Sequence, residues 1–448
     1  MKHGTTLAMV LALASGLGGC MDEKKEVEQY RRVLGGPSTL PAAAPALLTL
    51  QDAMRMANAR NEQLAASGED YLQALIDRDR AASAFLPTLS LQPSYYHMEH
   101  VTLPPEAATF FPLHAFDLPL NAQMNVFNGF RDVSGLKQAA ANIDQRKALL
   151  KDLQSTLLVE VSQVYYQVLR AEKVSAVLSN SVKVQEDRVH DLQNQFDAGV
   201  ARKVDLQQAL AQAAATRVSR VDAQADVVRG RATLAFLIGA PEVACPLTDR
   251  FEVPQAPPLE SLQKEASTRR QDLAAAIAGV GAAKQGLQQA LGEYYPSVSA
   301  NVNDFLYRQS FPMTSEWIYM FSANIPIFSG FRIEADVRTA LSRLRQAKLS
   351  ESLVRRQIVE TVRIAHENLV SARQSLVELR TELAAAQEGY NQAANSFKAG
   401  TGTNLETLIA QDQLLRAQVQ LASQEFEYKV AYLTLIRVVG MLEINSAS

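Results

Sequence analysis

The sequence predicts a mainly α-helical protein with a small β part, built as two tandem repeats that each contain two strands and a long helical hairpin. Three observations predict this class. Short motifs recur at a fixed spacing, long proline-free segments carry an unbroken heptad pattern, and segments of about ten residues alternate between apolar and polar side chains.

The duplication is visible as pairs of motifs that lie 201 residues apart. Pro87 and Pro296 are instead 209 residues apart, so the first half has the longer connection between its strands. A spacing that holds over three landmarks indicates a tandem copy of one unit. The landmarks are FNGFR from Phe127 and FSGFR from Phe328, FDAG from Phe196 and FKAG from Phe397, and Gly239 and Gly440.

The N-terminal segment predicts export and a lipid anchor. Residues 1–19 form a signal peptide whose apolar run, Leu7 to Leu17, is too short to span a bilayer. Small residues precede Cys20, as in bacterial lipoprotein signals, so we expect cleavage before Cys20 and acylation of its thiol; an ordinary secretory signal with an incidental cysteine is the alternative. Residues 20–47, charged and then rich in Pro and Ala, predict a lipid-anchored tether.

Each repeat is expected to open with a helix, continue through two strands and close with a helical hairpin, and a proline-rich linker joins the two repeats. The expected ranges are 48–239 for the first repeat, with strands at about 86–98 and 115–127 and a hairpin at 131–238; 240–260 for the linker; and 261–448 for the second repeat, with strands at about 295–308 and 316–328 and a hairpin at 332–440.

The strand segments alternate in the manner of transmembrane β-strands. In the second repeat Trp317, Tyr319 and Phe321 alternate with polar residues such as Ser322 and Asn324. One apolar face, one polar face and aromatic residues near the ends suit strands placed between lipid and a polar interior. The alternative is a soluble β-sandwich in which one face of the strands is buried away from water. The residues expected to form aromatic membrane girdles are Tyr294, Tyr295, Tyr307, Trp317 and Tyr319.

The helical segments carry the seam of a coiled coil. Apolar positions in 358–397 follow one another in steps of four and three, and 157–196 keeps the same register. As one helix, the proline-free segment 131–196 would extend on the order of 100 Å. Gly199 and Gly400 each follow such a segment, and glycine there predicts the left-handed residue at which a helix ends and the chain turns back.

Composition and motifs exclude several functions. The formal net charge is −3, without a basic stripe, so nucleic acid is not an expected partner. No catalytic constellation or phosphate-binding loop stands out, so we expect neither an enzyme nor a cofactor. His97, His100 and His114 lie near Glu99, but His97 and His100 are three residues apart and would face opposite sides of a strand, so no metal site is expected.

The number of strands constrains the assembly. Irregular or unpaired backbone leaves amide groups unsatisfied in lipid, so strands that span a bilayer must form a closed barrel. The smallest single-chain barrels use about eight strands. Four strands per chain are too few, and several copies must therefore share one wall.

The doubled order of strand, strand, long helix and returning helix, with FNGFR and FSGFR after the second strand and FDAG and FKAG at the hairpin turn, resembles the TolC family of outer-membrane efflux proteins. The cysteine after the signal makes the chain look like lipidated members that serve pumps of the resistance-nodulation-division type. The resemblance implies a homotrimer with a shared twelve-stranded β-barrel and a coiled-coil tunnel, anchored by lipid in the outer membrane and extending into the periplasm. It also implies a passive export duct that works with a periplasmic adaptor and an inner-membrane efflux pump.

The resemblance also points to site residues near the hairpin turns. Alignment on Gly400 puts Glu406 where some members carry the first of two aspartates that narrow the tunnel, whereas Ile409 occupies the second position; Asp205 is the repeat counterpart of Glu406. The alternative is that Glu406 is a solvated carboxylate in the first turn of a helix, where negative charge is favoured. The expected adaptor-docking residues, for which turn chemistry alone is the alternative, are Gly199, Val200, Ala201, Gly400, Thr401 and Gly402.

A lipid-anchored periplasmic coiled-coil scaffold or adaptor without a pore is the competing function. The aromatic strands discriminate between the two, because a scaffold has no use for lipid-facing Trp317, Tyr319 and Phe321.

Overall fold

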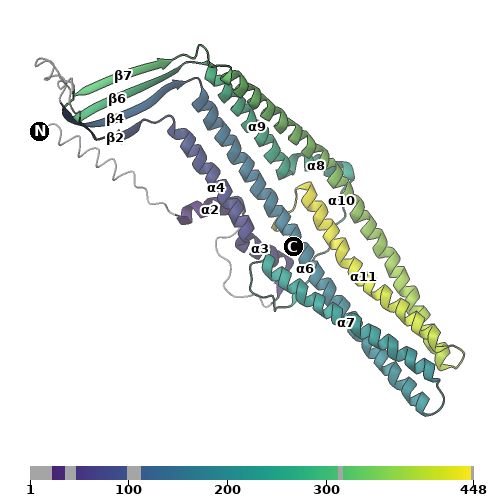
Figure 1. Cartoon of the computed structure of the whole chain (residues 1–448). Helices are drawn as coiled ribbons and strands as arrows, with labels where there is room; N and C mark the ends of the chain where they lie inside the picture. The colour runs from purple at the N-terminus through teal and green to yellow at the C-terminus, as the bar shows by residue number, and fades with distance from the viewer. Residues whose placement is uncertain (1–22, 36–46, 98–112, 311–315, 445–448) are drawn as a thin grey trace, which may run out of the picture. The chain divides into compact units, whose positions relative to one another are not determined.

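The computed structural model describes residues 23–35, 47–97, 113–310 and 316–444 (Figure 1). The expected signal peptide, Cys20, His100 and Glu99 lie outside these ranges. The chain divides into two compact units, which we call the sheet unit and the hairpin unit. The sheet unit comprises Met1–Tyr30, Glu69–Ala148 and Ala274–Ser352, and the hairpin unit comprises Arg31–Gly68, Leu149–Leu273 and Leu353–Ser448.

The order of elements in the second half repeats that of the first, which confirms the predicted fold class. Each half has two short helices, then strands, then a long helix and a returning helix. The helices are α2 (Glu23–Val33), α3 (Leu50–Arg60), α4 (Glu62–Ser83), α6 (Arg131–Asp197), α7 (Lys203–Leu237), α8 (Leu259–Arg269), α9 (Gln271–Leu291), α10 (Arg332–Lys398) and α11 (Asn404–Val439). The strands are β1 (Leu48–Thr49), β2 (Thr88–Leu91), β3 (Ser94–His97), β4 (His114–Asn128), β5 (Leu247–Thr248), β6 (Ser297–Arg308) and β7 (Trp317–Asn324).

None of the helices within the described ranges combines the length and the hydropathy that a membrane span requires.

The sheet unit contains one antiparallel sheet in the order β2-β4-β6-β7, with β3 also paired to β4. The predicted strand at 86–98 was wrong in one respect, because it is divided into β2 and β3 at Gln92 and Pro93. The Gln92 amide donates to the carbonyl oxygen of Pro119 on β4 at 3.2 Å, but Pro119 lacks an amide hydrogen for the return bond. The strand predicted at 316–328 ends early, at Asn324, two residues before Pro326, for the same reason. β2 and β3 follow one another along β4, so the sheet is four ribbons wide.

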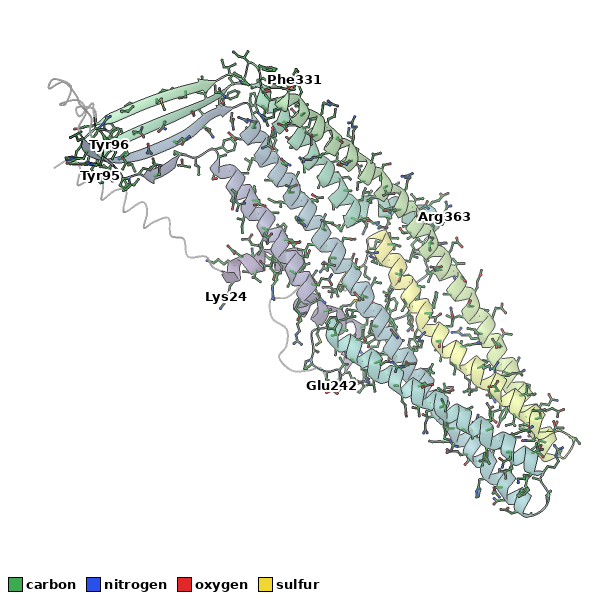
Figure 2. All side chains as sticks on the ribbon, in the orientation of Figure 1. Lys24, Tyr95, Tyr96, Glu242, Phe331 and Arg363 are labelled. Atoms are coloured by element: carbon green, nitrogen blue, oxygen red, sulfur yellow. The ribbon has the colours of Figure 1, made fainter. Side chains whose placement is uncertain are left out.

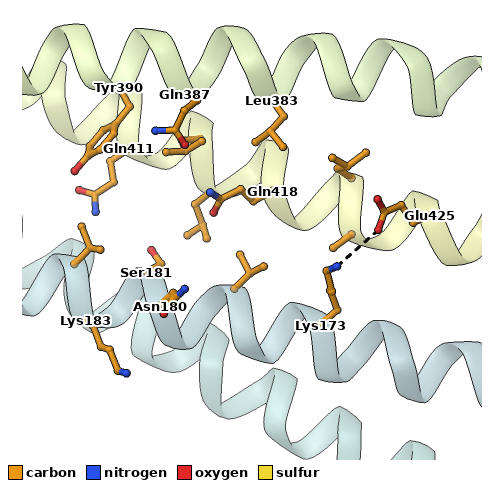
Figure 3. Close-up of a pocket in the computed structure, with 16 residues that line it drawn as sticks. Lys173, Asn180, Ser181, Lys183, Leu383, Gln387, Tyr390, Gln411, Gln418 and Glu425 are labelled. Carbon is orange, nitrogen blue, oxygen red and sulfur yellow. Dashed lines mark ion pairs between the residues drawn. The ribbon is translucent and has the colours of Figure 1, made fainter. Parts of the chain in front are cut away.

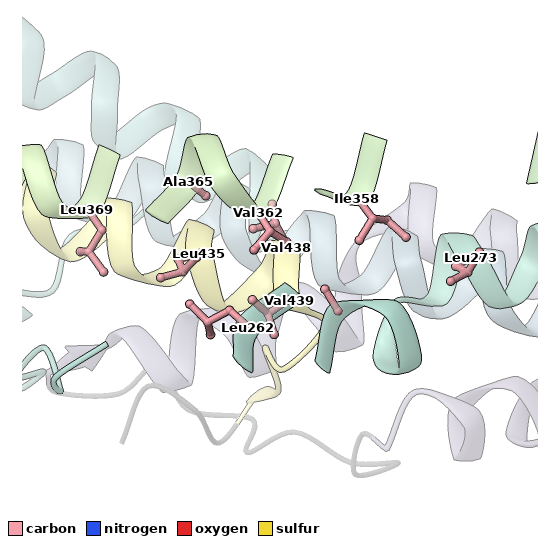
Figure 4. Close-up of a cluster of buried hydrophobic side chains, with 10 residues drawn as sticks. Leu262, Leu273, Ile358, Val362, Ala365, Leu369, Leu435, Val438 and Val439 are labelled. Atoms are coloured by element: carbon pink, nitrogen blue, oxygen red, sulfur yellow. The ribbon is translucent and has the colours of Figure 1, made fainter. Parts of the chain in front are cut away.

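The heptad seam predicted in the second repeat forms part of an apolar core in the hairpin unit (Figure 4). The first seam positions on α10 are buried and pack against α8 and the C-terminal end of α11. Packing removes the periodic apolar faces of these neighbouring helices from water. The buried cluster consists of Leu262, Ala266, Leu273, Ile358, Val362, Ala365, Leu369, Leu435, Val438 and Val439.

Two segments predicted to be connections contain regular structure. The expected tether includes α2, in which Val27, Tyr30 and the following Leu34 recur at helical spacing; Tyr30 and Leu34 are buried. In the expected linker, β5 pairs in parallel with β1. The Tyr165 hydroxyl lies 2.8 Å from the carbonyl oxygens of both Leu48 and Thr248, and so holds the linker on α6.

Candidate functional sites in the sheet and at the hairpin turns

The apolar face of β7 carries large aromatic side chains that stay exposed in the single chain. The exposed fractions are 48% for Trp317, 65% for Tyr319 and 76% for Phe321. The Trp317 and Tyr319 rings stack with centroids 6.2 Å apart and an interplanar angle of 10°. An ordered, exposed stripe of this kind marks a surface that another apolar phase or molecule covers.

The predicted girdle residues lie at both ends of the sheet. Tyr294 and Tyr295 lie just before β6, separated from it by Pro296, and Tyr307 lies near its other end, against Phe116 at a centroid distance of 5.9 Å. From Tyr295 to Tyr307 the strand extends about 40 Å at roughly 3.3 Å per residue. A tilt of about 40° reduces this to a height of roughly 30 Å, close to the apolar band of about 25 Å in outer-membrane barrels.

Further aromatic side chains mark the same two ends. Tyr95 and Tyr96 lie at the end of the sheet away from the helices, and Phe331 lies where the sheet passes into α10 (Figure 2). Phe331 has φ of 65° and its repeat counterpart Phe130 has φ of 61°, a conformation that bulky residues rarely adopt. The two strand-to-helix junctions therefore share an unusual backbone as well as a sequence motif.

The hairpin turns have the geometry that the glycines predict. Gly199 and Gly400 have φ of +76° and +73°. The amide of Val200 donates to the carbonyl oxygen of Gln195 at 2.8 Å, and the amide of Thr401 donates to that of Ser396 at 2.9 Å. These are the bonds of a Schellman motif, which closes the end of a helix. Val200 is 79% exposed, so the first turn presents an apolar side chain to its surroundings.

Glu406 has a defined structural role in the single chain. Its carboxylate accepts from the backbone amide of Thr403 at 2.8 Å, and the Thr403 hydroxyl oxygen accepts from the amide of Glu406 at 3.3 Å. This capping box begins α11. The side chain is nevertheless exposed, so the role of a constriction stays a prediction beside that of a helix cap.

Asp205, the counterpart of Glu406, is placed differently. Arg202 donates to its carboxylate through Nε at 2.9 Å and through Nη2 at 3.0 Å. The Asp205 side chain is 12% exposed whereas that of Arg202 is 73% exposed. The paired guanidinium offsets the charge of this carboxylate, so Asp205 is a weaker candidate than Glu406 for an acidic ring.

A polar contact between the two hairpins was missed at the level of sequence. Arg188 on α6 donates from Nη2 to Oδ1 of Asn404 at 2.7 Å, and Asn404 Nδ2 donates to the Asp205 carbonyl oxygen at 3.1 Å. The Arg188 guanidinium also lies 5.3 Å from the centre of the Phe397 ring. Burial lowers the pKa of the Arg188 guanidinium. A half-buried guanidinium that donates to the amide oxygen of buried Asn404 makes a link of this kind costly to break.

A cavity of about 780 Å³ lies in the hairpin unit between α6, α10 and α11 (Figure 3). Its polar lining consists mainly of amide and hydroxyl side chains, and an ion pair joins Lys173 to Glu425 at 4.0 Å. Neutral amides of this kind bind through hydrogen bonds and supply no nucleophile or general base. The cavity therefore offers space and mainly neutral polar contacts.

A second charged cluster surrounds Asp152 on α6. Burial raises the pKa of the Asp152 carboxyl, and nearby Asp272 adds to this effect, whereas Arg437 and Arg270 oppose it. The Arg437 Nη2 lies 3.8 Å from the Asp152 Oδ1, too far for a hydrogen bond. The two arginines thus offset only part of the cost of removing the Asp152 carboxylate from water.

Two of the histidines noted in the sequence, His97 and His114, lie within the described residues. His97 of β3 lies opposite His114 of β4 in the antiparallel register. Among the residues that the structure describes, no group of three or more His, Cys, Asp or Glu side chains is arranged to hold a metal ion.

Comparison with known proteins agrees with the repeat structure. The family model described as outer membrane efflux protein matches residues 53–240 and 262–441, one segment in each repeat. The outer membrane efflux protein BepC of Brucella suis biovar 1 (strain 1330) is 25% identical over 323 residues, which cover 71% of this chain and 70% of that protein. The outer membrane protein TolC of Escherichia coli (strain K12) is 22% identical over 431 residues, which cover 91% of this chain and 85% of that protein.

The fold also matches a solved structure. A crystal structure of a membrane protein from Pseudomonas aeruginosa superposes with a TM-score of 0.79 at 18% identity, over 90% of this chain and 98% of that one. At this identity the likeness shows the fold alone.

Proposed function

The chain belongs to the outer membrane efflux protein family, and on that premise we propose that it is one subunit of a homotrimeric channel that exports solutes across the outer membrane and periplasm. The channel is passive. An inner-membrane pump supplies the energy, and a periplasmic adaptor connects the pump to the channel. Substrate selection then belongs mostly to the pump.

The observation that supports the channel most is the sheet with one aromatic face and two open edges. It is four ribbons wide and ends at β2 and β7. Only closed strand arrangements satisfy their amides in lipid, and four ribbons are about half of the smallest barrel. Three copies would supply twelve ribbons, enough for a closed wall around a polar interior.

A lipid-anchored scaffold without a pore is the second candidate function. The long helical hairpins would serve it equally well. The exposed aromatic stripe at Trp317, Tyr319 and Phe321 favours the channel, because exposed rings without an apolar partner lower solubility and contribute nothing to a periplasmic scaffold.

Recordings in planar lipid bilayers test the proposal. Protein extracted from membranes with detergent and added to one side should produce stepwise conductance of a water-filled pore. Protein that remains soluble without detergent and leaves the bilayer current unchanged would support the scaffold instead.

The membrane anchor is proposed at Cys20. Radiolabelled palmitate should enter the full-length chain in cells, and Cys20→Ala should abolish the incorporation. Cys245→Ser is the matched control, because Cys245 is a free, half-buried thiol in the linker. Label that persists in Cys20→Ala would show that Cys20 is not the acylated residue.

The hairpin turns are proposed to dock the periplasmic adaptor, and the ring of Glu406, with a lesser contribution from Asp205, to narrow the tunnel. Exposed Val200 and the small residues around it permit close approach of a partner helix. A photo-crosslinker in place of Val200 should capture the adaptor, whereas one in place of Val228, a 68% exposed valine of α7, should not. Equal capture at both positions would remove the turns as the docking site.

A further inference from the structure

The antiparallel register brings together two histidines that are not neighbours in the sequence. His97 is the last residue of β3 and His114 is the first residue of β4, and the two lie directly opposite each other. Opposite residues of an antiparallel pair point to the same face of the sheet, with Cβ atoms about 4.5–5.5 Å apart. The spacing of His97 and His100 predicts no metal site, but the register gives His97 a different partner.

The backbone hydrogen bonds place this pair in the closer of the two antiparallel arrangements. The amide of Phe116 donates to Oε1 of Gln309, directly after β6, at 2.8 Å, and so points away from β3. The carbonyl oxygen of Pro119 accepts from the Gln92 amide at 3.2 Å, so Pro119 faces the side of β2 and β3. Because these directions alternate along a strand, His114 points the same way as Phe116, and the two histidines form a non-hydrogen-bonded pair. In such a pair the Cα atoms approach to about 4.5 Å and the side chains lie closest together.

Both imidazoles are open to solvent. His97 and His114 are exposed, and neither imidazole has a hydrogen-bond or ion-pair partner among the residues that the structure describes. Tyr95, two residues before His97 and on the same face, lies at the end of the sheet away from the helices (Figure 2). The ring nitrogens at this end are therefore accessible to an ion in the surrounding water.

We propose that His97 and His114 together bind one divalent transition-metal ion, and that Cu²⁺ binds most tightly. Metal–nitrogen bonds of about 2.0–2.1 Å bring two ligand nitrogens to about 3 Å from each other, which imidazoles on opposite Cβ atoms can reach. Imidazole suits Cu²⁺, Ni²⁺ and Zn²⁺, and among these ions affinity is highest for Cu²⁺. Mg²⁺ and Ca²⁺ prefer oxygen ligands, which this pair does not supply.

The ion would fasten one strand to its neighbour. β3 has four residues and, within the described sheet, pairs with β4 alone. Coordination across the pair adds a link at the end of this short strand, since metal binding stabilises the conformation that holds its ligands. Both ligands come from one chain, so the site is independent of the proposed channel and of the number of copies in it. The alternative is that the two imidazoles only extend the aromatic border of the sheet.

Copper binding to the purified full-length protein tests the pair. The protein carries Cys245→Ser, which removes a free thiol that would compete for copper, and an affinity tag without histidine. It is stripped of metal with EDTA and titrated with Cu²⁺ in a calorimeter. His97→Ala and His114→Ala should each lower the affinity roughly tenfold or more, because the second imidazole binds at a high effective concentration once the first holds the ion. His190→Ala is the matched control, because it removes an exposed histidine from α6 and should leave the affinity unchanged.

Pulsed electron paramagnetic resonance counts the imidazoles on the bound Cu²⁺. Wild type and His190→Ala should show two imidazoles, whereas His97→Ala and His114→Ala should show at most one. The wild-type spectrum gives the number of ligands by itself, so the test does not depend on how well the variants fold. One imidazole in the wild-type spectrum, or equal copper affinity in wild type and both single variants, would overturn the proposal and leave the two histidines as part of the aromatic border.

Discussion

Arg188 donates from Nη2 to Asn404 Oδ1 at 2.7 Å, and this bond joins α6 of the first hairpin to the first turn of α11 in the second. Asn404 is 2% exposed, so its amide depends on protein partners for hydrogen bonds. The hairpin turns are therefore tied together by a buried contact whose loss would let them separate.

Removing the guanidinium tests this tie. Arg188→Ala leaves the Asn404 oxygen without its charged donor, at a cost of about 1–3 kcal/mol. We expect lower thermal stability and a larger single-channel conductance. Arg217→Ala is the control, because its 3.4 Å pair with Glu186 lies on the surface, where such pairs contribute about 0–1 kcal/mol. Identical conductance and stability in the two variants would show that the Arg188–Asn404 bond does not hold the two hairpins together.

The aromatic face of β7 should tolerate no charge. Trp317→Asp and Phe321→Asp would each place a carboxylate in lipid at a cost of roughly 2–4 kcal/mol, and we expect a loss of heat-resistant oligomers on gels. Gln123→Glu puts the same charge on the polar face of β4 and should assemble normally. Normal oligomer yield from both aspartate variants would count against lipid contact at this face.

The charge of Glu406 is separable from its role as a helix cap. Glu406→Gln removes the charge but keeps an oxygen that can accept from the Thr403 amide, whereas Thr403→Ala removes the hydroxyl of the capping box and keeps the charge. If the carboxylates form a ring in the pore, Glu406→Gln alone lowers the preference for cations, measured from reversal potentials in a salt gradient. Equal reversal potentials in wild type and Glu406→Gln would remove Glu406 from the pore lining.

The stability of the hairpin unit should depend on pH through Asp152. Its folded pKa is raised from the ordinary value, mainly by burial, so the folded state binds more protons than the unfolded state between the two pKa values. This contribution to stability is present below the unfolded pKa and is lost as the pH rises through the folded pKa. Asp152→Asn should therefore raise the melting temperature at neutral pH, and the difference from wild type should shrink as the pH falls toward about 4. A difference in melting temperature that grew as the pH fell would show that folding lowers the pKa of Asp152 instead of raising it.

The periodic parts of the fold were predictable from sequence, because each rests on local physics. Heptad spacing located α6 and α10, and Gly199 and Gly400 marked their ends to within two residues. The strand boundaries were less accurate near Pro119, which lies opposite the break between β2 and β3, and near Pro326, because a single missing amide outweighed an otherwise alternating pattern at each place. In α2, three helically spaced apolar residues were hidden by the charged composition around them.

The polar contacts of the candidate site were not predictable in the same way. Arg188 and Asn404 are 216 residues apart, and nothing in either local pattern connects them. One signal was available, since Gln185 occupies a seam position between Val182 and Val189 and is only 2% exposed. A polar residue in an apolar seam indicates a buried polar layer, although its partners depend on how the hairpins pack.

The number of chains in the detergent-solubilised particle tests the central claim most directly. Native mass spectrometry of the full-length protein should give three copies, because the proposed trimer closes its wall with four ribbons from each chain. A stable particle of one chain, folded in buffer without lipid or detergent, would contradict the account.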